Sequence, residues 1–201
     1  MPRPHANPRT AHRAPCAVAF AVALLISFTA FSPAGPGRFP DRSPLGHTGG
    51  FGEPTCARCH AGSAINSASG ALTLQGLPAA YEPAQRYRLV VNLDHRGVRR
   101  AGFQLAIRFN KGEAAGQAAG GVRALDDRVQ LADSLGVRYA FHTSAGSAIT
   151  APNQAVWFLE WTAPRDGGRV VAHFVASATN DDASELGDLV YADSAVSDPA
   201  R

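Results

Sequence analysis

The chain has 201 residues, of which 45% are hydrophobic and 17% charged, and its formal net charge is +3. The whole positive surplus lies in Arg3, Arg9 and Arg13, because basic and acidic residues balance from Gly35 onward. The balanced net charge of this part gives no electrostatic reason to expect binding to nucleic acid or to an anionic membrane. No nucleic-acid partner is therefore expected.

Residues 1–34 have the order of a secretory signal peptide. A basic stretch without acids comes first, the apolar run Ala17–Phe31 follows, and Ser32-Pro33-Ala34 offers small residues for cleavage. The apolar run is shorter than the roughly 20 residues that a transmembrane helix needs. We expect an exported protein, periplasmic or at the cell surface, that is held at a membrane only if the leader stays uncleaved.

Residues 35–55 are rich in Gly and Pro and predict an extended, structureless lead-in. Cys16 belongs to the leader and leaves with it, so Cys56 and Cys59 are the only cysteines expected in the mature protein. A framework of long-range disulfides is therefore excluded for this domain.

Residues 56–60 read Cys56-Ala57-Arg58-Cys59-His60, which is the attachment signature of a c-type haem. Two thiols at this spacing can reach the two vinyl groups on one porphyrin edge. The adjacent imidazole of His60 can then bind the iron as proximal ligand. The motif predicts one covalent haem c, and attachment of this kind takes place outside the cytoplasm, in agreement with the leader.

Two other interpretations of this motif stay open. Cys56 and Cys59 could form a small structural or redox disulfide, with His60 incidental. The same three residues could also contribute to a zinc site, but such a site normally needs four protein ligands. No second Cys or His pair with suitable spacing follows in the sequence.

After the motif, the periodicity is that of β-strands. Short runs rich in Val, Leu, Phe, Tyr and Trp are separated by Gly, Pro, Asn and Asp, which favours an all-β sandwich over residues 61–195. The expected strands are Ala71–Leu74, Tyr87–Leu93, Ala101–Phe109, Tyr139–His142, Ala155–Thr162, Val170–Ala178 and Asp188–Asp193. Trp157 and Trp161 point to one side of a strand and are expected in the core. The stretch Gly112–Asp133 predicts loops with one weakly marked strand.

Several motifs in this order resemble bacterial exported domains related to the reeler domain, often called choice-of-anchor domains. They are Gly49-Gly50-Phe51-Gly52-Glu53-Pro54-Thr55-Cys56-x-x-Cys59-His60, Gly76-Leu77-Pro78-x-x-Tyr81-x-Pro83, Ala101-Gly102-Phe103-Gln104, His142-Thr143-Ser144-Ala145-Gly146, Trp157-x-x-x-Trp161-Thr162-Ala163-Pro164, and Asn180-Asp181-Asp182 with Gly187-Asp188-Leu189-Val190-Tyr191. The resemblance implies an immunoglobulin-like antiparallel β-sandwich, here preceded by the haem-attachment loop. It also implies a surface or periplasmic setting, and little about activity.

The second ligand of a haem iron is constrained by the inventory of side chains. Met1 is the only methionine and lies in the leader, so a Met/His cytochrome is excluded. The remaining candidates are four histidines or an open site: His47, His95, His142 and His173. His142 is the leading candidate because it ends an aromatic strand before a Ser/Gly loop. The equal alternative is that His142 is a strand-end histidine hydrogen-bonded to a turn. His173 is expected to serve packing or to lie at the surface, and His95 is expected to be solvated in a turn.

The combined expectation is an exported, monohaem c-type protein that serves electron transfer or haem-based sensing with an unidentified redox partner protein. Its iron would be held by His60 and His142. The main alternative is an interaction module without haem, in which Cys56 and Cys59 form a disulfide. A redox enzyme with an open haem site is a third possibility. No nucleophile elbow or phosphate loop is present, and Asp126-Asp127 and Asp181-Asp182 fit solvated loops better than a calcium site.

Overall fold

The computed structural model describes residues 44–201. The expected signal peptide at 1–34 and the first part of the lead-in lie outside the described residues. Within the described range, no helix is both long and apolar enough to cross a membrane.

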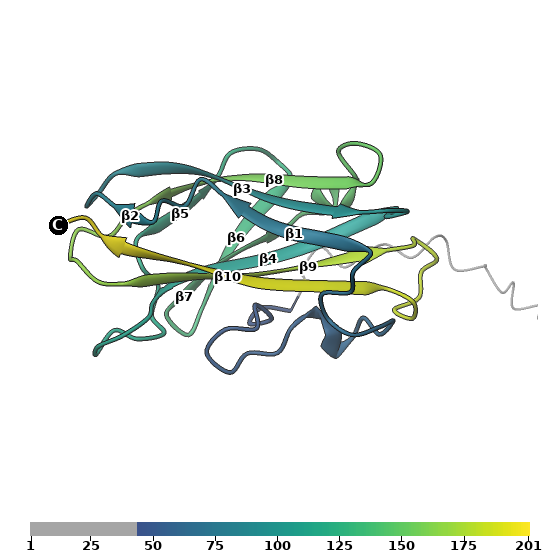
Figure 1. The fold of residues 1–201 in the computed structure, drawn as a ribbon, viewed down its shortest axis with the longest axis horizontal. Coiled ribbons are helices and arrows are strands. Elements are labelled where there is room, and N and C mark those ends of the chain that lie inside the picture. Colours follow the sequence, from purple (N-terminus) through teal and green to yellow (C-terminus); the bar gives the residue numbers. More distant parts are fainter. Residues whose placement is uncertain (1–43) are drawn as a thin grey trace, which may run out of the picture. The chain divides into compact units, whose positions relative to one another are not determined.

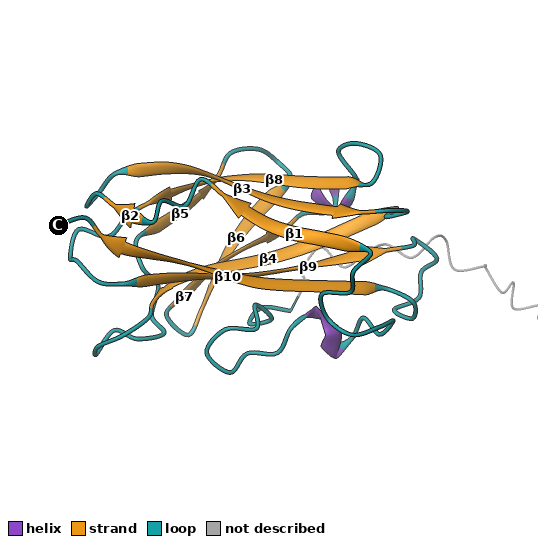
Figure 2. Ribbon diagram, in the orientation of Figure 1, coloured by secondary structure: helices purple, strands orange, loops and turns teal. Residues whose placement is uncertain are grey.

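The described chain is built from β-strands joined by loops, with two short 3-10 turns (Figures 1 and 2). In chain order the elements are η1 Cys56–Arg58, β1 Gly70–Gln75, β2 Ala80–Tyr81, β3 Arg86–His95, β4 Arg100–Phe109, β5 Gly121–Ala124, β6 Val129–Ser134, β7 Val137–His142, η2 Ala145–Ser147, β8 Gln154–Thr162, β9 Val170–Thr179 and β10 Leu189–Pro199.

The strands form two sheets that pack face to face (Figure 2). One sheet has the order β1-β3-β8-β5, and the other has the order β2-β10-β9-β4-β7-β6. Every strand pair is antiparallel except the short contact between β2 and β10, which is parallel. The all-β, antiparallel sandwich expected from the sequence is confirmed.

Alternation of side chains explains how the core forms. In β8, every second residue is buried, so that Trp157, Leu159 and Trp161 face the opposite sheet while their neighbours are only partly covered. Trp157 stacks on Phe103 of β4 at a ring-centroid distance of 4.6 Å. The indole Nε1 of Trp161 donates to the carbonyl oxygen of Ala119 at 2.9 Å, so this buried polar atom is satisfied.

Strand β4 is buried on both faces, unlike β8. Phe103 and Leu105 face the sandwich core, whereas Gln104 and Arg108 lie on the outer face and are equally shielded from solvent. A second layer must therefore cover the outer face of the six-stranded sheet. The described part of the lead-in supplies this layer, together with η1 (Figure 1).

The lead-in from residue 44 is an ordered loop, so the expectation of a structureless segment at 35–55 is wrong for this part. Glu53 forms an ion pair with the buried guanidinium of Arg108 and accepts hydrogen bonds from Thr48 and Tyr139. Gln104 accepts a hydrogen bond from the His47 amide at 2.8 Å and donates to the Pro44 carbonyl oxygen at 3.1 Å. These polar contacts hold the Gly- and Pro-rich segment in place although, from residue 44 on, it forms no regular helix or strand before η1.

Two further regions differ from the sequence expectations. The stretch 112–133 contains β5 and the larger part of β6, where one weak strand was expected. Strand β10 runs to Pro199, well beyond Asp193, where the last expected strand ended, because it pairs along β9 and then with β2. The residues of β10 after Tyr191 are mostly small or polar, and tertiary pairing rather than propensity makes them a strand.

Candidate functional site

The Cys-x-x-Cys-His motif forms a single 3-10 turn that continues the docked lead-in. Thr55 caps this turn, since its Oγ1 accepts a hydrogen bond from the Ala57 amide at 3.3 Å. The amides of Cys59 and His60 both donate to the carbonyl oxygen of Cys56, at 3.2 and 2.9 Å. The turn therefore brings the two cysteines and the histidine into one compact segment.

The loop between β9 and β10 holds the chain just after the motif. The Ala61 amide donates to the Glu185 carbonyl oxygen at 2.8 Å, and the Gly187 amide donates back to the Ala61 carbonyl oxygen at 2.8 Å. Gly62 then passes so close to the loop that a Cβ would lie 2.1 Å from the Asp188 carbonyl oxygen. Only glycine allows this approach.

This clamp places His60 opposite Asp188, which lies 128 positions later in the chain. His60 Nδ1 and Asp188 Oδ2 are 2.6 Å apart. The Asp188 side chain is 1% exposed and that of His60 32% exposed, so the pair joins a buried acid to a partly accessible ring. A histidine held in this way through Nδ1 keeps Nε2 for another partner.

A pocket of about 430 Å³ lies between the motif, the β9–β10 loop and the outer face of the six-stranded sheet. Its lining includes all the residues that the sequence analysis selected for haem attachment and iron ligation: Cys56, Cys59, His60 and His142. Gly102, Gln104 and Ser177 form part of the sheet side of the pocket. Pockets of this size are typical of small-molecule and cofactor sites.

His142 reaches the pocket from the end of β7. Its Nδ1 is 3.2 Å from the Phe103 amide nitrogen and 3.3 Å from the Phe103 carbonyl oxygen. Burial lowers the pKa of His142; a hydrogen bond with the Phe103 backbone opposes this shift and the charge of His60 adds to it. A neutral imidazole, which is the form that binds metals, is therefore favoured at this position.

Both cysteines are free thiols, so the disulfide of the alternative interpretation is not formed in the structure. Burial raises the pKa of the Cys56 thiol to about 12, whereas Cys59 is exposed. Redox-active Cys-x-x-Cys pairs depend on a lowered thiol pKa. The environment of Cys56 is the opposite of the one that such chemistry needs.

The other histidines lie in different surroundings. His173 packs edge-on against Phe51 at a centroid distance of 5.5 Å and is absent from the lining of the pocket. His95 was expected in a solvated turn, but it is partly shielded from water. Its ring centroid lies 6.1 Å from that of Tyr191, and desolvation lowers its pKa. His47 lines the pocket, and its ring Nδ1 contacts the Leu45 carbonyl oxygen at 3.2 Å.

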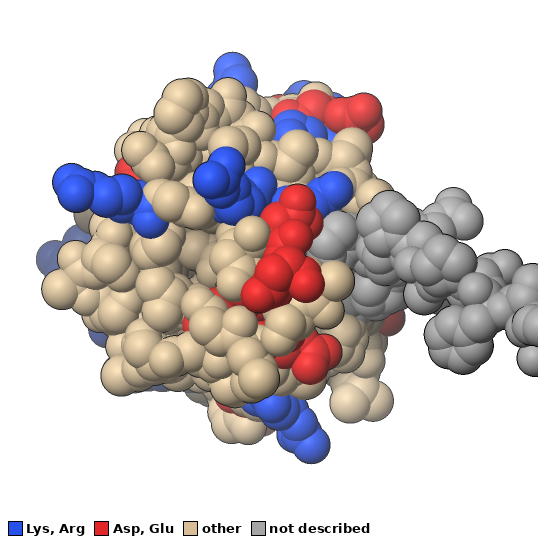
Figure 3. Space-filling view, turned by 90° about the vertical axis from the view of Figure 1, so that its right-hand side faces the viewer, with Lys and Arg blue, Asp and Glu red and all other residues tan. Residues whose placement is uncertain are grey.

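The acidic residues of the β9–β10 loop lie at the end of the sandwich that faces the viewer in Figure 3, where Asp and Glu side chains gather. Asp181 forms an ion pair with Arg100 at 2.9 Å, and Asp182 accepts hydrogen bonds from Asn180 and from the Ser184 amide. Among residues 44–201, no group of three or more His, Cys, Asp or Glu side chains is arranged to hold a metal ion.

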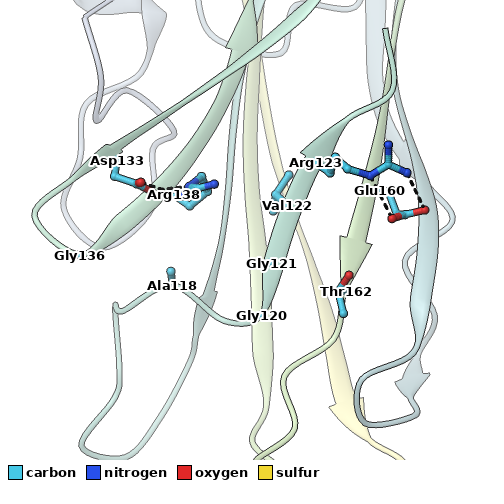
Figure 4. Close-up of a pocket in the computed structure, with 10 residues that line it drawn as sticks. All are labelled: Ala118, Gly120, Gly121, Val122, Arg123, Asp133, Gly136, Arg138, Glu160 and Thr162. Carbon is cyan, nitrogen blue, oxygen red and sulfur yellow. Dashed lines mark hydrogen bonds and ion pairs between the residues drawn. The ribbon is translucent and has the colours of Figure 1, made fainter.

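A second hollow, of about 420 Å³, lies between β5, the β6–β7 hairpin and the end of β8 (Figure 4). Its charged side chains are paired with each other, Arg123 with Glu160 and Arg138 with Asp133. None of the residues that the sequence analysis selected lines it.

Two residues of the site, Asp188 and Gly102, could not be identified from the sequence alone. Both lie within expected strands and within two of the motifs on which the resemblance to reeler-like domains was based, but those motifs indicate no role for either residue. Their roles depend on contacts with His60 and His142, which are far away in the sequence.

No protein-family model matches the chain, and no curated protein sequence matches it. Similar solved structures include a crystal structure of the human F-spondin reeler domain, with 18% identity over 70% of this chain and 95% of that chain and a TM-score of 0.46. Another structure of that domain gives 19% identity over 72% and 96%, with a TM-score of 0.43. A cohesin module of a Clostridium perfringens family 33 glycoside hydrolase has 11% identity over 66% and 98%, with a TM-score of 0.42. These similarities concern the fold alone.

Proposed function

We propose that this chain is an exported c-type haem protein that carries one haem on Cys56 and Cys59 and serves electron transfer. The observation that supports this most is the shared pocket. The attachment motif and His142, which are 82 positions apart, line one cavity of suitable size. Nothing in the composition or in the strand pattern required these residues to meet.

The donor set of the pocket fits a haem. Cys56 and Cys59 supply the thiols for two thioether bonds, and each of these bonds forms by addition of an S–H across one vinyl group. His60 has its Nδ1 occupied by Asp188, which leaves Nε2 as the atom for the iron. Gly102 makes room for the ring of His142, since a Cβ there would lie 2.7 Å from its Cε1. A bound haem would supply a one-electron ferric/ferrous couple.

The residues around the pocket account for the rest of the proposed role. His60 is bonded to Asp188, and His142 contacts the backbone of Phe103. Ligands positioned by such contacts favour electron transfer, because their geometry then changes little between oxidation states. The partner would be a redox protein that approaches the exposed side of Cys59. Should His142 remain unbound to iron, the same site would suit the sensing of a small ligand.

Covalent attachment of haem in cells tests the proposed function. The full chain should be expressed with haem-maturation machinery and compared with the double variant Cys56→Ala/Cys59→Ala. A denaturing gel stained for haem should show a coloured band for the native chain alone, while circular dichroism should show β-structure for both. A colourless native band from cells that mature a control cytochrome contradicts the proposal.

A further inference from the structure

Asp188 is the most deeply buried acid that contacts the attachment motif. Its side chain is 1% exposed, and its Oδ2 lies 2.6 Å from His60 Nδ1. Its other oxygen, Oδ1, is buried and has no hydrogen-bond partner among the described residues. Burying a carboxylate with half of its acceptors unused is unfavourable for folding. The contact with His60 is therefore the side-chain interaction that offsets part of the cost of burying Asp188.

The backbone holds Asp188 at this place independently of the ion pair. Gly187, which precedes it, has a φ of +84° and donates to the Ala61 carbonyl oxygen, and β10 begins directly after it. Gly62 lies in contact with the Asp188 carbonyl group, where no side chain would fit. Asp188 is thus fixed by two crossing segments, which is what a residue needs in order to orient another one.

We infer that Asp188 is the positioning residue of the proximal ligand: it fixes the His60 ring with Nδ1 as the protonated nitrogen, aims Nε2 at the iron, and lowers the reduction potential of the haem. This inference rests on the proposed function. Asp188 touches neither iron nor porphyrin in this scheme, and acts only through His60.

The effect on potential follows from the charge. The carboxylate of Asp188 lies in a poorly solvated place, where a negative charge acts more strongly on its surroundings than it does in water. A carboxylate that accepts the Nδ1 proton makes the imidazole a stronger electron donor to its metal. Both effects stabilise ferric over ferrous iron, and the hydrogen-bonded environment of an axial ligand is one of the main controls on haem potential.

Asp188→Asn separates charge from geometry. The amide oxygen of Asn can still accept the Nδ1 hydrogen, so the ring stays oriented while the charge disappears. Asp182→Asn is the matched control, because Asp182 lies in the same loop and lines the same pocket, but bonds to Asn180 and Ser184 instead of His60. Asp188→Glu restores the charge and tests rescue.

In redox titrations of the haem-loaded full chain, Asp188→Asn should raise the ferrous-to-ferric ratio at fixed ambient potential at least tenfold, which is 59 mV for one electron. Asp182→Asn removes the same charge from the pocket without touching His60, and it should raise the ratio far less, because water screens the charge of this exposed carboxylate. Asp188→Glu should return the ratio toward the native value. Equal potentials for the native chain and Asp188→Asn overturn the inference, as does an equal rise in Asp182→Asn.

A second measurement does not need haem. In the haem-free full chain, nitrogen-15 NMR should show His60 as the Nδ1–H tautomer, with Nε2 unprotonated, and Asp188→Ala should release this preference. An Nε2–H tautomer in the native chain overturns the inference. Absence of haem from the matured native chain is a separate result, which contradicts the proposed function and is read from the mass and not from the tautomer.

Discussion

The imidazole of His142 lies directly against the backbone of Gly102 on the neighbouring strand. A Cβ at Gly102 would come within 2.7 Å of the ring Cε1 and within 3.1 Å of both ring nitrogens. The missing side chain at position 102 is what allows the last residue of β7 to place its ring at the pocket. The candidate iron ligand therefore depends on a glycine in the adjacent strand.

Gly102→Ala should displace the His142 ring and destabilise the fold by about 1–3 kcal/mol, the usual effect of overpacking. Denaturant unfolding measures the stability, and the visible spectrum of the haem-loaded chain reports the ring. Gly121→Ala is the matched control, since a Cβ at that strand glycine would meet no atom within 4 Å. Equal stabilities and spectra for the two variants would show that the close contact has no consequence.

If His142 binds the iron, the native ferric protein should be low-spin and should lack the weak near-infrared band of methionine ligation. Its potential should lie below that of a Met/His cytochrome. His142→Ala should then give a high-spin site that binds cyanide or carbon monoxide rapidly, as seen in the visible spectrum. His173→Ala serves as control, because its ring packs against Phe51 outside the pocket. A high-spin native protein with a silent His142→Ala would favour ligand sensing over electron transfer.

Docking of the lead-in should depend on pH through Glu53. Burial raises the pKa of Glu53, but hydrogen bonds from Thr48, Tyr139 and Arg108, together with the Arg108 charge, outweigh it and lower the pKa below 4.5. The carboxylate therefore stabilises the fold fully above pH 4.5, and this contribution is lost as the pH falls through the lower value of the folded state.

Glu53→Gln should leave Arg108 buried without a counter-charge and destabilise the protein at neutral pH by about 3 kcal/mol. In unfolding curves measured from pH 7 down to pH 3, the difference in unfolding free energy from the native chain should shrink as the pH falls below 4.5. Glu113→Gln, at an exposed loop position, is the control and should have the same unfolding free energy as the native chain at every pH. A constant difference between Glu53→Gln and the native chain at every pH would contradict the role of this ion pair.

Before haem attachment, the two cysteines should differ in reactivity. Burial raises the pKa of the Cys56 thiol to about 12, so little of it is thiolate at pH 8, whereas Cys59 is exposed. Iodoacetamide should modify Cys59 well before Cys56 in the folded, haem-free chain, and equally in denaturant, as followed by peptide mass spectrometry. Resistance of both residues to alkylation, reversed by a reductant, would instead show the disulfide of the alternative interpretation.

The sandwich could be predicted from the sequence because its strands carry their signal locally. The alternation around Trp157 and Trp161 reflects one buried face, and such a pattern is readable without a partner strand. Strand β10 lacks this signal in its second half, which becomes a strand because its backbone pairs with β9. The lead-in misled for a related reason: Glu53 and Arg108 form its anchor, and nothing local indicates that residues 55 positions apart will pair.

The candidate site, too, could be predicted from the sequence only in part. The spacing of Cys56, Cys59 and His60 carries a chemical signature that survives without a structure, and His142 could be selected by its place at a strand end. Asp188 could not, because its importance comes from a backbone bridge that sets Ala61 beside the β9–β10 loop. Such a second layer of contacts is a property of the fold and has no motif of its own.

The intact mass of the mature chain is the measurement that tests the central claim most directly. The protein should be exported from cells that carry haem-maturation machinery, purified, denatured and weighed. One covalently bound haem on Cys56 and Cys59 requires the polypeptide mass plus one haem, and Cys56→Ala/Cys59→Ala should show the polypeptide mass alone. A native chain that carries only a two-hydrogen deficit would contain the Cys56–Cys59 disulfide, and would contradict the haem proposal.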